Sequence, residues 1–332
     1  MKVVIDEHIP YIREAAERLF DEVVYLRGAD ISRNDIRDAD ALIVRTRTRC
    51  NRQLLDGTRV GFIATATIGY DHLDTSYLAE AGIGWANCPG CNAGSVAQYV
   101  RNVLLLLAPG ATVGLIGVGH VGKAVAGALR QAGFRVLLND PPREQKEGIR
   151  LNTLRELQDE CNVISVHTPL THAGPFATHY LIDRVFLCGC KHKPVIINTA
   201  RGGVVCEADL LAALSSEQVS AAVVDTWEGE PHINPELLER AAIATPHIAG
   251  YSADGKANAS RMALEAVCCH FGITSEFTIS PPPLPVHIKP TGNKLQDALL
   301  LYDPRRDSER LKAAPEQFEQ LRNSYPLRRE MF

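Results

Sequence analysis

Short apolar runs alternate with helical patterns along the first part of the chain. The runs at 3–5, 23–26, 41–44 and 60–65 predict strands, and the spacing of apolar residues from Pro10 to Phe20 predicts a helix with a proline in its first turn. Strands that alternate with helices indicate a parallel sheet covered on both faces. Polar segments follow two of the strands, at 45-RTRTR-49 and 67-TIGYDHLD-74. Such strand ends are where α/β folds place their sites.

A second unit follows a long helix predicted over 93–107, which the sequence 108-APG-110 ends. Its strands are predicted at 112–116, 135–139, 163–166, 195–198 and 221–224, with a helical pattern between each pair. A further helix over about 255–271 is expected to pack back on the first unit. The stretch 281-PPPLP-285 predicts a stiff spacer, followed by a tail unit with a strand-like 299-LLLY-302 and a charged helix at 309–323. The fold class predicted is α/β.

Composition and charge argue against nucleic-acid and membrane partners. Net charge is 35 − 39 = −4, which argues against nucleic acid or an anionic membrane surface as a partner. The N-terminal 1-MKVVIDEHIP-10 lacks the apolar run of a signal peptide, and 103-VLLLLA-108 is too short to span a bilayer. We therefore expect a soluble, cytoplasmic protein.

The cysteines predict reduced thiols rather than a disulfide framework. There are nine of them, an odd number, and they are scattered along a chain long enough to build its own core. The pair in 88-CPGC-91 has the spacing of a redox or metal motif, but its Pro-Gly centre is more typical of a turn and no second pair follows. We expect no metal site, and we expect the remaining pairs to be buried apolar residues, namely Cys188, Cys190, Cys268 and Cys269.

The glycine-rich segment 117-GVGHVG-122 follows a predicted strand and opens a predicted helix. In a dinucleotide site Gly117 allows the tight turn, Gly119 lets the backbone approach a pyrophosphate, and Gly122 packs the helix on the strand. The next strand ends in Asp140, a carboxylate suited to ribose hydroxyls and repulsive to a 2′-phosphate. This context favours an NAD site over the alternative of a structural glycine turn.

Three charged segments follow the later strands. The loop 199-TARGG-203 carries Arg201, which is suited to bidentate contact with a carboxylate, although a surface ion pair is the alternative. The segment 225-DTWEGEP-231 carries three acids, and 245-TPHIAGYS-252 carries His247. A lone His is more often a satisfied core residue. A carboxylate, an imidazole and a guanidinium at neighbouring strand ends are, however, the set that hydride transfer from a hydroxy acid requires.

With these segments in place, the chain resembles the D-isomer-specific 2-hydroxyacid dehydrogenases. The matching segments, in order, are 117-GVGHVG-122 with Asp140, 167-HTPLT-171, 197-INTARGG-203, 225-DTWEGEP-231 and 245-TPHIAGYS-252, and the resemblance covers about 1–270. It implies that Arg201, Glu230 and His247 are the catalytic residues. It also implies cofactor contacts for NAD, at Gly117, Gly119, His120, Val121, Gly122, Asp140, Thr168, Thr199, Ala200, Arg201, Asp225 and Gly250.

The match is closer still to one member of that family, which oxidises a phosphorylated hydroxy acid. The segments that carry it are 1-MKVVIDEHIPY-11, 62-FIATATIGYDHLD-74, 88-CPGCNAGSVAQYV-100, 140-DPPR-143, 245-TPHIAGYSADGKA-257 and 302-YDPRRDSERLK-312. Implied substrate contacts are Thr46, Thr67 and Tyr251. His120 departs from the resemblance, because a small amide is more familiar at that position of the glycine loop.

The resemblance also implies the domain organisation. It gives a flavodoxin-like substrate domain at 1–92 with 252–275, a Rossmann NAD domain at 93–251, both doubly wound parallel sheets, and a C-terminal α+β dimerisation domain at 280–332. We expect this last domain to be shortened, because the sequence stops soon after 327-LRREMF-332, and we expect a homodimer.

The mechanism expected is oxidation of a secondary hydroxyl to a 2-oxo acid. Arg201 would hold the substrate carboxylate in a cleft between the domains, His247 would take the hydroxyl proton, and Glu230 would stabilise the imidazolium that forms. Arg45, Arg47 and Arg49 alternate, so in extended backbone they would share one side, where they would either meet a phosphate or face solvent. Two alternatives stay open: a related dehydrogenase, such as one acting on phosphoglycerate, and an NAD-sensing binding protein.

Overall fold

The computed structural model describes residues 1–274 and 276–331, and the chain divides into two compact units. Unit 1 comprises Met1–Asn92 together with Ser252–Pro283. Unit 2 comprises Ala93–Tyr251 and the C-terminal part of the chain from Leu284 onward. The C-terminal segment is thus part of unit 2.

Unit 1 is built on a five-stranded parallel sheet with the strand order β2-β1-β3-β4-β5. The strands are β1 (Lys2–Asp6), β2 (Glu22–Leu26), β3 (Ala41–Val44), β4 (Phe62–Thr65) and β5 (Gly84–Ala86). Every residue of β3 and β4 is buried, as expected for central strands covered on both faces. This is the flavodoxin-like order of a doubly wound sheet, in which sites form at the carboxyl ends of the strands.

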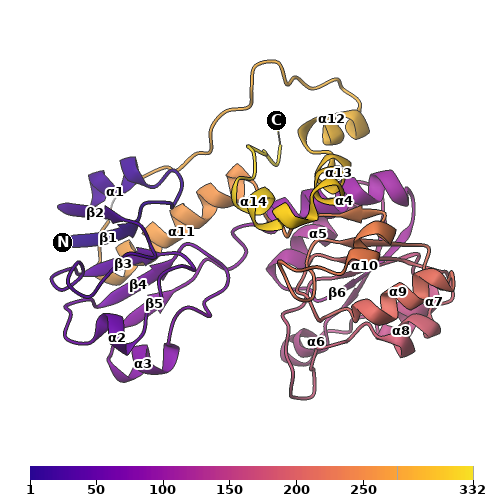
Figure 1. Cartoon of the computed structure of the whole chain (residues 1–332), viewed down its shortest axis with the longest axis horizontal. Coiled ribbons are helices and arrows are strands. Elements are labelled where there is room, and N and C mark those ends of the chain that lie inside the picture. Colours follow the sequence, from indigo (N-terminus) through magenta and orange to yellow (C-terminus); the bar gives the residue numbers. More distant parts are fainter. Residues whose placement is uncertain (275, 332) are drawn as a thin grey trace. The chain divides into compact units, whose positions relative to one another are not determined.

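The helices of unit 1 include one long element contributed from late in the sequence. They are α1 (Arg13–Leu19), α2 (Arg52–Leu55), α3 (Thr75–Glu80) and α11 (Ala253–Phe271). The side chain of Ser252 caps α11 by accepting a hydrogen bond from the Gly255 N–H, and Gly272 ends the helix in the left-handed conformation, with φ of 66°. Buried alanines on α11 let the helix lie close to β3, β4 and β5 (Figure 1).

Unit 2 contains a six-stranded parallel sheet with the order β11-β10-β9-β8-β6-β7. Its strands are β6 (Thr112–Ile116), β7 (Arg135–Asn139), β8 (Val163–Val166), β9 (Val195–Asn198), β10 (Ala221–Val224) and β11 (Ile243–Ala244). The chain reverses direction across the sheet between β6 and β8, which opens a crevice at their carboxyl ends. The predicted α/β class with two doubly wound parallel sheets is confirmed.

Helices flank this sheet and carry the loops of the site (Figure 1). They are α4 (Ala93–Leu107), α5 (His120–Gln131), α6 (Pro141–Glu147), α7 (Leu154–Glu160), α8 (Arg184–Gly189), α9 (Glu207–Ser215) and α10 (Pro235–Arg240). The predicted bounds of α4 are confirmed. Its buried face packs on α5, which fixes the direction in which α5 leaves the glycine loop.

The C-terminal segment is helical, so the predicted α+β unit is wrong in its β component. The segment contains α12 (Lys294–Leu301), α13 (Pro304–Ala313), a short 3₁₀ turn (Pro315–Gln317) and α14 (Phe318–Asn323), and it forms no strand within the part that the structure describes. The strand predicted at 299–302 lies mostly in α12. The Asn293 side chain caps this helix, and the helical signal outweighs the short apolar run. The single helix predicted at 309–323 is broken at Ala314, before Pro315.

The nine cysteines are all free thiols. Cys88 and Cys91 are buried in a turn closed by the Cys91 N–H to Cys88 O bond, and burial raises the pKa of Cys88 to about 12. Cys188 and Cys269 are exposed, so the expectation that they are buried is wrong, whereas Cys190 and Cys268 are buried. No helix among the described residues is long and apolar enough to cross a membrane.

Candidate active site

The glycine loop between β6 and α5 has room for a ligand and no room for side chains at two of its three glycines. Gly117 has φ of 91°, and a Cβ there would lie 2.8 Å from the backbone of His167. A Cβ at Gly122 would lie 2.0 Å from the carbonyl oxygen of Gly117. A Cβ at Gly119 would meet nothing within 4 Å, so this glycine faces open space. These are the properties of a loop that turns tightly and leaves its outer face open to a phosphate.

The open face lies at the N-terminus of α5. His120 is the first residue of this twelve-residue helix and is exposed, while Val121 is half-buried. The first turn of a helix has backbone N–H groups without intrahelical partners and a positive potential. Gly119 and His120 therefore lie where the pyrophosphate of a dinucleotide would be held.

Asp140 directly follows β7 and organises the loop from the other side. One carboxylate oxygen accepts a hydrogen bond from the Val118 N–H at 2.7 Å, and the other accepts one from the Arg143 N–H at 3.0 Å. A carboxylate offers about four lone-pair sites, so about two remain for ligand hydroxyls. The Arg143 guanidinium pairs with Glu147 at 2.8 Å instead of with Asp140.

A cavity of about 560 Å³ lies beside these groups, lined by Gly117, Gly119, Asp140, Thr168 and the loop through Thr178. The hydroxyl of Thr168 is buried and has no hydrogen-bond partner among the residues that the structure describes. A buried hydroxyl without a partner is costly, and a bound ligand would satisfy it. The cavity, the open face at Gly119 and this hydroxyl together fit NAD.

The residues that directly follow β8 and β9 at the crevice are neutral. His167 contacts the hydroxyls of Ser165 at 3.0 Å and Thr199 at 3.4 Å, and burial lowers its pKa from 6.5 to about 4. Ala200 is buried, with its N–H donated to the side-chain oxygen of Asn198. His167 is therefore a neutral imidazole at physiological pH.

The structure brings Glu230 and His247 into direct contact. His247 Nδ1 lies 2.8 Å from one Glu230 carboxylate oxygen and 3.1 Å from the other. Burial would raise the pKa of Glu230, but the hydrogen bond and the charge of His247 outweigh it and lower that pKa. Glu230 is thus a carboxylate that engages Nδ1 of His247, and Nε2 is the ring nitrogen that Glu230 leaves unengaged.

His247 is held in an unusual backbone conformation, with φ of 56°. Its N–H is donated to the carbonyl oxygens of Asp225 at 2.8 Å and Thr245 at 3.0 Å. A left-handed conformation is uncommon for a residue other than glycine and persists only where the surroundings enforce it. The His247 loop is therefore set by its contacts with the loop after β10.

Asp225 provides most of this enforcement. It is completely buried, and its carboxylate accepts hydrogen bonds from the Thr245 hydroxyl at 2.6 Å and from the N–H groups of Ile248 at 2.8 Å and Ala249 at 3.0 Å. Burial raises the pKa of Asp225, and these donors oppose that rise. This geometry makes Asp225 an organiser of the His247 loop, while its contact with the cofactor stays a prediction.

Arg201 follows β9, the strand next to β10. The side chain of Asn198 donates to the carbonyl oxygens of Arg201 at 3.0 Å and Thr226 at 3.1 Å, which ties the two loops together. A Cβ at Gly202 would lie 2.0 Å from the Trp227 carbonyl oxygen, so only glycine allows this approach. Arg201 is exposed, and its Nη1 donates to the carbonyl of Ala200.

A pair of glutamates braces the same two loops. The Glu228 N–H donates to Glu207 at 2.7 Å, and the Glu207 N–H donates to Glu228 at 3.0 Å. Burial, followed by the charges of Glu228 and Glu230, raises the pKa of Glu207 to about 7. The sequence analysis missed Glu207, although it follows the 199-TARGG-203 loop closely and faces an acid of 225-DTWEGEP-231.

Two predicted substrate contacts lie in unit 1, at the carboxyl ends of neighbouring strands. Thr46 follows β3 and is exposed, while Thr67 follows β4 and shares a hydrogen bond of 2.7 Å with the Thr65 hydroxyl. The arginine-rich segment is a turn closed by the Thr48 N–H to Arg45 carbonyl bond at 3.2 Å, so the extended backbone considered for it is wrong. A turn abolishes the alternation of sides that extended backbone would give.

The third, Tyr251, lies in unit 2 next to Gly250 and just beyond His247. Its hydroxyl accepts a hydrogen bond from Nε of Arg322 at 3.2 Å. Arg322 belongs to α14, and its Nη1 lies 3.7 Å from a Glu230 carboxylate oxygen. The sequence analysis missed Arg322, since no local pattern links a C-terminal helix to this site.

Comparisons with known proteins identify the family of the chain. Residues 96–249 match the family model of the D-isomer specific 2-hydroxyacid dehydrogenase NAD binding domain. Erythronate-4-phosphate dehydrogenase of Bacteroides thetaiotaomicron is 51% identical, with 99% of this chain and 97% of that protein covered. The same enzyme of Porphyromonas gingivalis is 43% identical, with 100% and 94% covered. The structure of NAD⁺-bound 3-phosphoglycerate dehydrogenase from Entamoeba histolytica superposes with a TM-score of 0.65 at 26% identity, covering 84% of this chain and 98% of that one.

The fold and the site define an NAD-dependent oxidoreductase acting on a hydroxyl donor. The chain belongs to the D-isomer-specific 2-hydroxyacid dehydrogenases and, within them, to the erythronate-4-phosphate dehydrogenase family.

Proposed function

We propose that the chain oxidises 4-phospho-D-erythronate to (R)-3-hydroxy-2-oxo-4-phosphooxybutanoate, a step of pyridoxal 5′-phosphate biosynthesis. The observation that carries this proposal is the Glu230–His247 pair, with 2.8 Å between its closest atoms, in a chain 51% identical over its length to an erythronate-4-phosphate dehydrogenase. NAD, when bound, supplies the hydride acceptor for such a reaction. The protein's own residues position the hydroxy acid and move its proton.

His247 is the general base. Its Nδ1 is engaged by Glu230, so Nε2 is the nitrogen that takes the proton of the substrate hydroxyl. The carboxylate of Glu230 then stabilises the imidazolium that forms, as an adjacent acid does in other His-based sites. The strained backbone of His247 and its bonds to the Asp225 loop keep the ring in place during the transfer.

Arg201 holds the substrate carboxylate next to the reacting carbon. A guanidinium binds a carboxylate through two parallel hydrogen bonds and polarises the adjacent C–O bond as it becomes a carbonyl. Thr46, Thr67 and Tyr251 contact the substrate through their hydroxyls. The cofactor is held by the glycine loop, Asp140, Thr168, Thr199, Ala200, Asp225 and Gly250.

The C-terminal segment is proposed to mediate self-association of the chain into a homodimer. Exposed apolar side chains on it, Leu295, Leu300 and Leu327, support this assignment. Light scattering of the full chain and of a Leu295→Lys/Leu300→Lys variant measures it. A dimer that becomes a monomer in the variant agrees with the proposal, and a monomeric full chain contradicts it.

The decisive test of the activity is NADH formation at 340 nm, measured with 4-phosphoerythronate and with 3-phosphoglycerate in parallel. A 2-oxo acid is added in a second series to reveal recycling of bound cofactor. Selective reduction with 4-phosphoerythronate supports the proposal. Selective reduction with 3-phosphoglycerate would favour the second candidate, supported by the solved phosphoglycerate dehydrogenase of the same fold. Silence with both substrates, despite NAD binding, would favour a binding protein.

A further inference from the structure

The C-terminal segment is fastened directly to the loop that carries His247. Arg328 is 4% exposed and donates hydrogen bonds to the carbonyl oxygens of Ile248 and Ala249, both at 3.2 Å. Its guanidinium also reaches the Ser95 carbonyl at 2.6 Å and stacks over the Tyr302 ring at 3.8 Å. A buried arginine with this many partners is a rigid anchor, so the residues just before it are fixed relative to His247.

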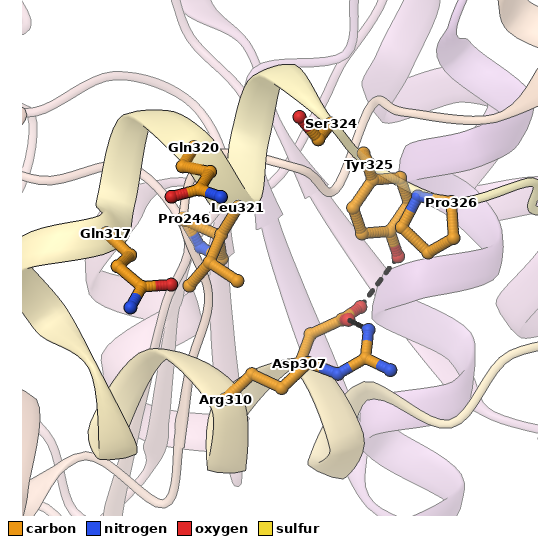
Figure 2. Close-up of a pocket in the computed structure, with 9 residues that line it drawn as sticks. All are labelled: Pro246, Asp307, Arg310, Gln317, Gln320, Leu321, Ser324, Tyr325 and Pro326. Atoms are coloured by element: carbon orange, nitrogen blue, oxygen red, sulfur yellow. Dashed lines mark hydrogen bonds and ion pairs between the residues drawn. The ribbon is translucent and has the colours of Figure 1, made fainter.

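A second set of contacts holds the same segment against the rest of unit 2. The Tyr325 hydroxyl donates to Asp307 at 2.6 Å, and its ring meets that of Tyr251 edge-on with centroids 6.1 Å apart. Figure 2 shows Asp307 with both Tyr325 and Arg310, around a small cavity that also includes Pro246. The segment therefore lies against the chain both before and after His247, at Pro246 and at Tyr251.

These anchors place Arg322 beside the catalytic pair. Its Nη1 lies 3.7 Å from Glu230, and its side chain is 28% exposed, similar to the 27% of His247. A separation of 3.7 Å is an ion pair but too long for a hydrogen bond. Glu230 uses its oxygens for His247 and for the Trp227 N–H at 2.9 Å. Glu230 thus attracts Arg322 without engaging its donors.

Most donors of Arg322 are unused. A guanidinium has five N–H groups, and among the described residues only Nε of Arg322 makes a hydrogen bond, to the Tyr251 hydroxyl at 3.2 Å. Both terminal nitrogens therefore remain available at a partly desolvated position. A fork of unused donors on a fixed cation is suited to an anion with several oxygens, and guanidinium groups bind phosphate bidentately, as they bind carboxylate.

We propose that Arg322, together with the Tyr251 hydroxyl, is a specificity-determining residue that binds the phosphate of the substrate. The inference rests on the proposed function, in which Arg201 takes the carboxylate and a second anionic group is left for another cation. Arg322 lies 322 − 249 = 73 residues beyond the end of the family match, so the cation comes from outside the matched NAD-binding domain. The C-terminal segment thereby selects phosphorylated hydroxy acids over unphosphorylated ones.

The test compares 4-phosphoerythronate with erythronate, which lacks the phosphate, in the wild type and in Arg322→Met and Arg322→Lys. We expect Arg322→Met to lower kcat/KM for 4-phosphoerythronate by roughly 10- to 100-fold, the effect of a lost charged hydrogen bond. Its kcat/KM for erythronate should change by less than about threefold, because that substrate offers no phosphate. Arg322→Lys should fall between the wild type and Arg322→Met, since it keeps the charge but loses the fork.

Arg310→Met is the matched control, a substitution in the same segment at a side chain that is 58% exposed. It should leave both substrates unaffected. Equal losses with both substrates in Arg322→Met, or a shift in its pH profile with erythronate, would assign Arg322 to positioning Glu230 and overturn the proposal. No loss with either substrate would overturn it as well.

A binding measurement separates this inference from the proposed activity. Calorimetric titration of 4-phosphoerythronate and of erythronate into the protein with NADH does not depend on turnover. If the wild type binds 4-phosphoerythronate but does not oxidise it, the proposed function fails, while weaker binding of that ligand alone in Arg322→Met still supports the inference. Unchanged binding of 4-phosphoerythronate in Arg322→Met overturns it.

Discussion

Replacing Glu207 by Gln should stabilise the protein at alkaline pH and leave it unchanged at acid pH. Glu207 is 7% exposed, and its pKa is raised from 4.5 to about 7, chiefly by burial. Between pH 4.5 and about pH 7, Glu207 is therefore mostly protonated in the folded state and mostly ionised in the unfolded state. Stability from this group is present at low pH and decreases as the pH rises from about 4.5 to about 7.

The size of the effect follows from the pKa shift. One pKa unit corresponds to about 1.4 kcal/mol, so a rise from 4.5 to about 7 makes the ionised Glu207 cost about 3 kcal/mol of stability above pH 7. Gln cannot ionise, and its amide oxygen still accepts the Glu228 N–H that Glu207 accepts at 2.7 Å. We expect the variant to exceed the wild type by up to about 3 kcal/mol at pH 8 and by less than about 0.5 kcal/mol at pH 4.5.

Urea unfolding followed by Trp227 fluorescence measures the difference in free energy of unfolding between the variant and the wild type. Trp227 reports on the unit that contains Glu207. Trp227 is 2% exposed and adjoins Glu228, and a Trp85→Phe background removes the other tryptophan of the chain. The control is Glu239→Gln, at an exposed position. Its free energy of unfolding should match that of the wild type at both pH values. A Glu207→Gln variant that is destabilised equally at both pH values would refute the reasoning, because its carboxylate would then be stabilising in the folded state.

Three further predictions concern the site. His247→Ala should bind NAD as the wild type does while kcat falls by about 100-fold or more, as expected for a lost general base; retained turnover would contradict its role. Gly122→Ala places a Cβ 2.0 Å from the Gly117 carbonyl and should weaken NADH binding at least tenfold by fluorescence titration, roughly 1.4 kcal/mol. Asp140→Ser removes the charge expected to repel a 2′-phosphate, so the NADP-to-NAD ratio of Kd should fall, and an unchanged ratio would exclude Asp140 from cofactor selection.

Much of the fold could be read from local patterns. The predicted bounds of β6, β7, β8, β9 and β10 agree with the structure because strands of a covered parallel sheet are short apolar runs closed by polar residues. The glycine spacing is equally local, since the close contact of Gly122 with the Gly117 carbonyl arises within one turn. Patterns failed where a competing local signal was stronger, as at 299–302, where the cap at Asn293 extends a helix over an apolar run.

The sequence by itself determined the two sheets, the glycine loop and the residue types that hydride transfer requires. Tertiary structure decided how those residues are held. The carboxylate of Asp225 supports the His247 loop 23 residues away, and Arg322 reaches Tyr251 across 71 residues. Hydrophobic period and turn chemistry act over a few residues, so they specify elements and leave their partners open. Which polar groups meet depends on how the packed elements bring distant strand ends and the C-terminal helix to one place, and only the folded chain contains that information.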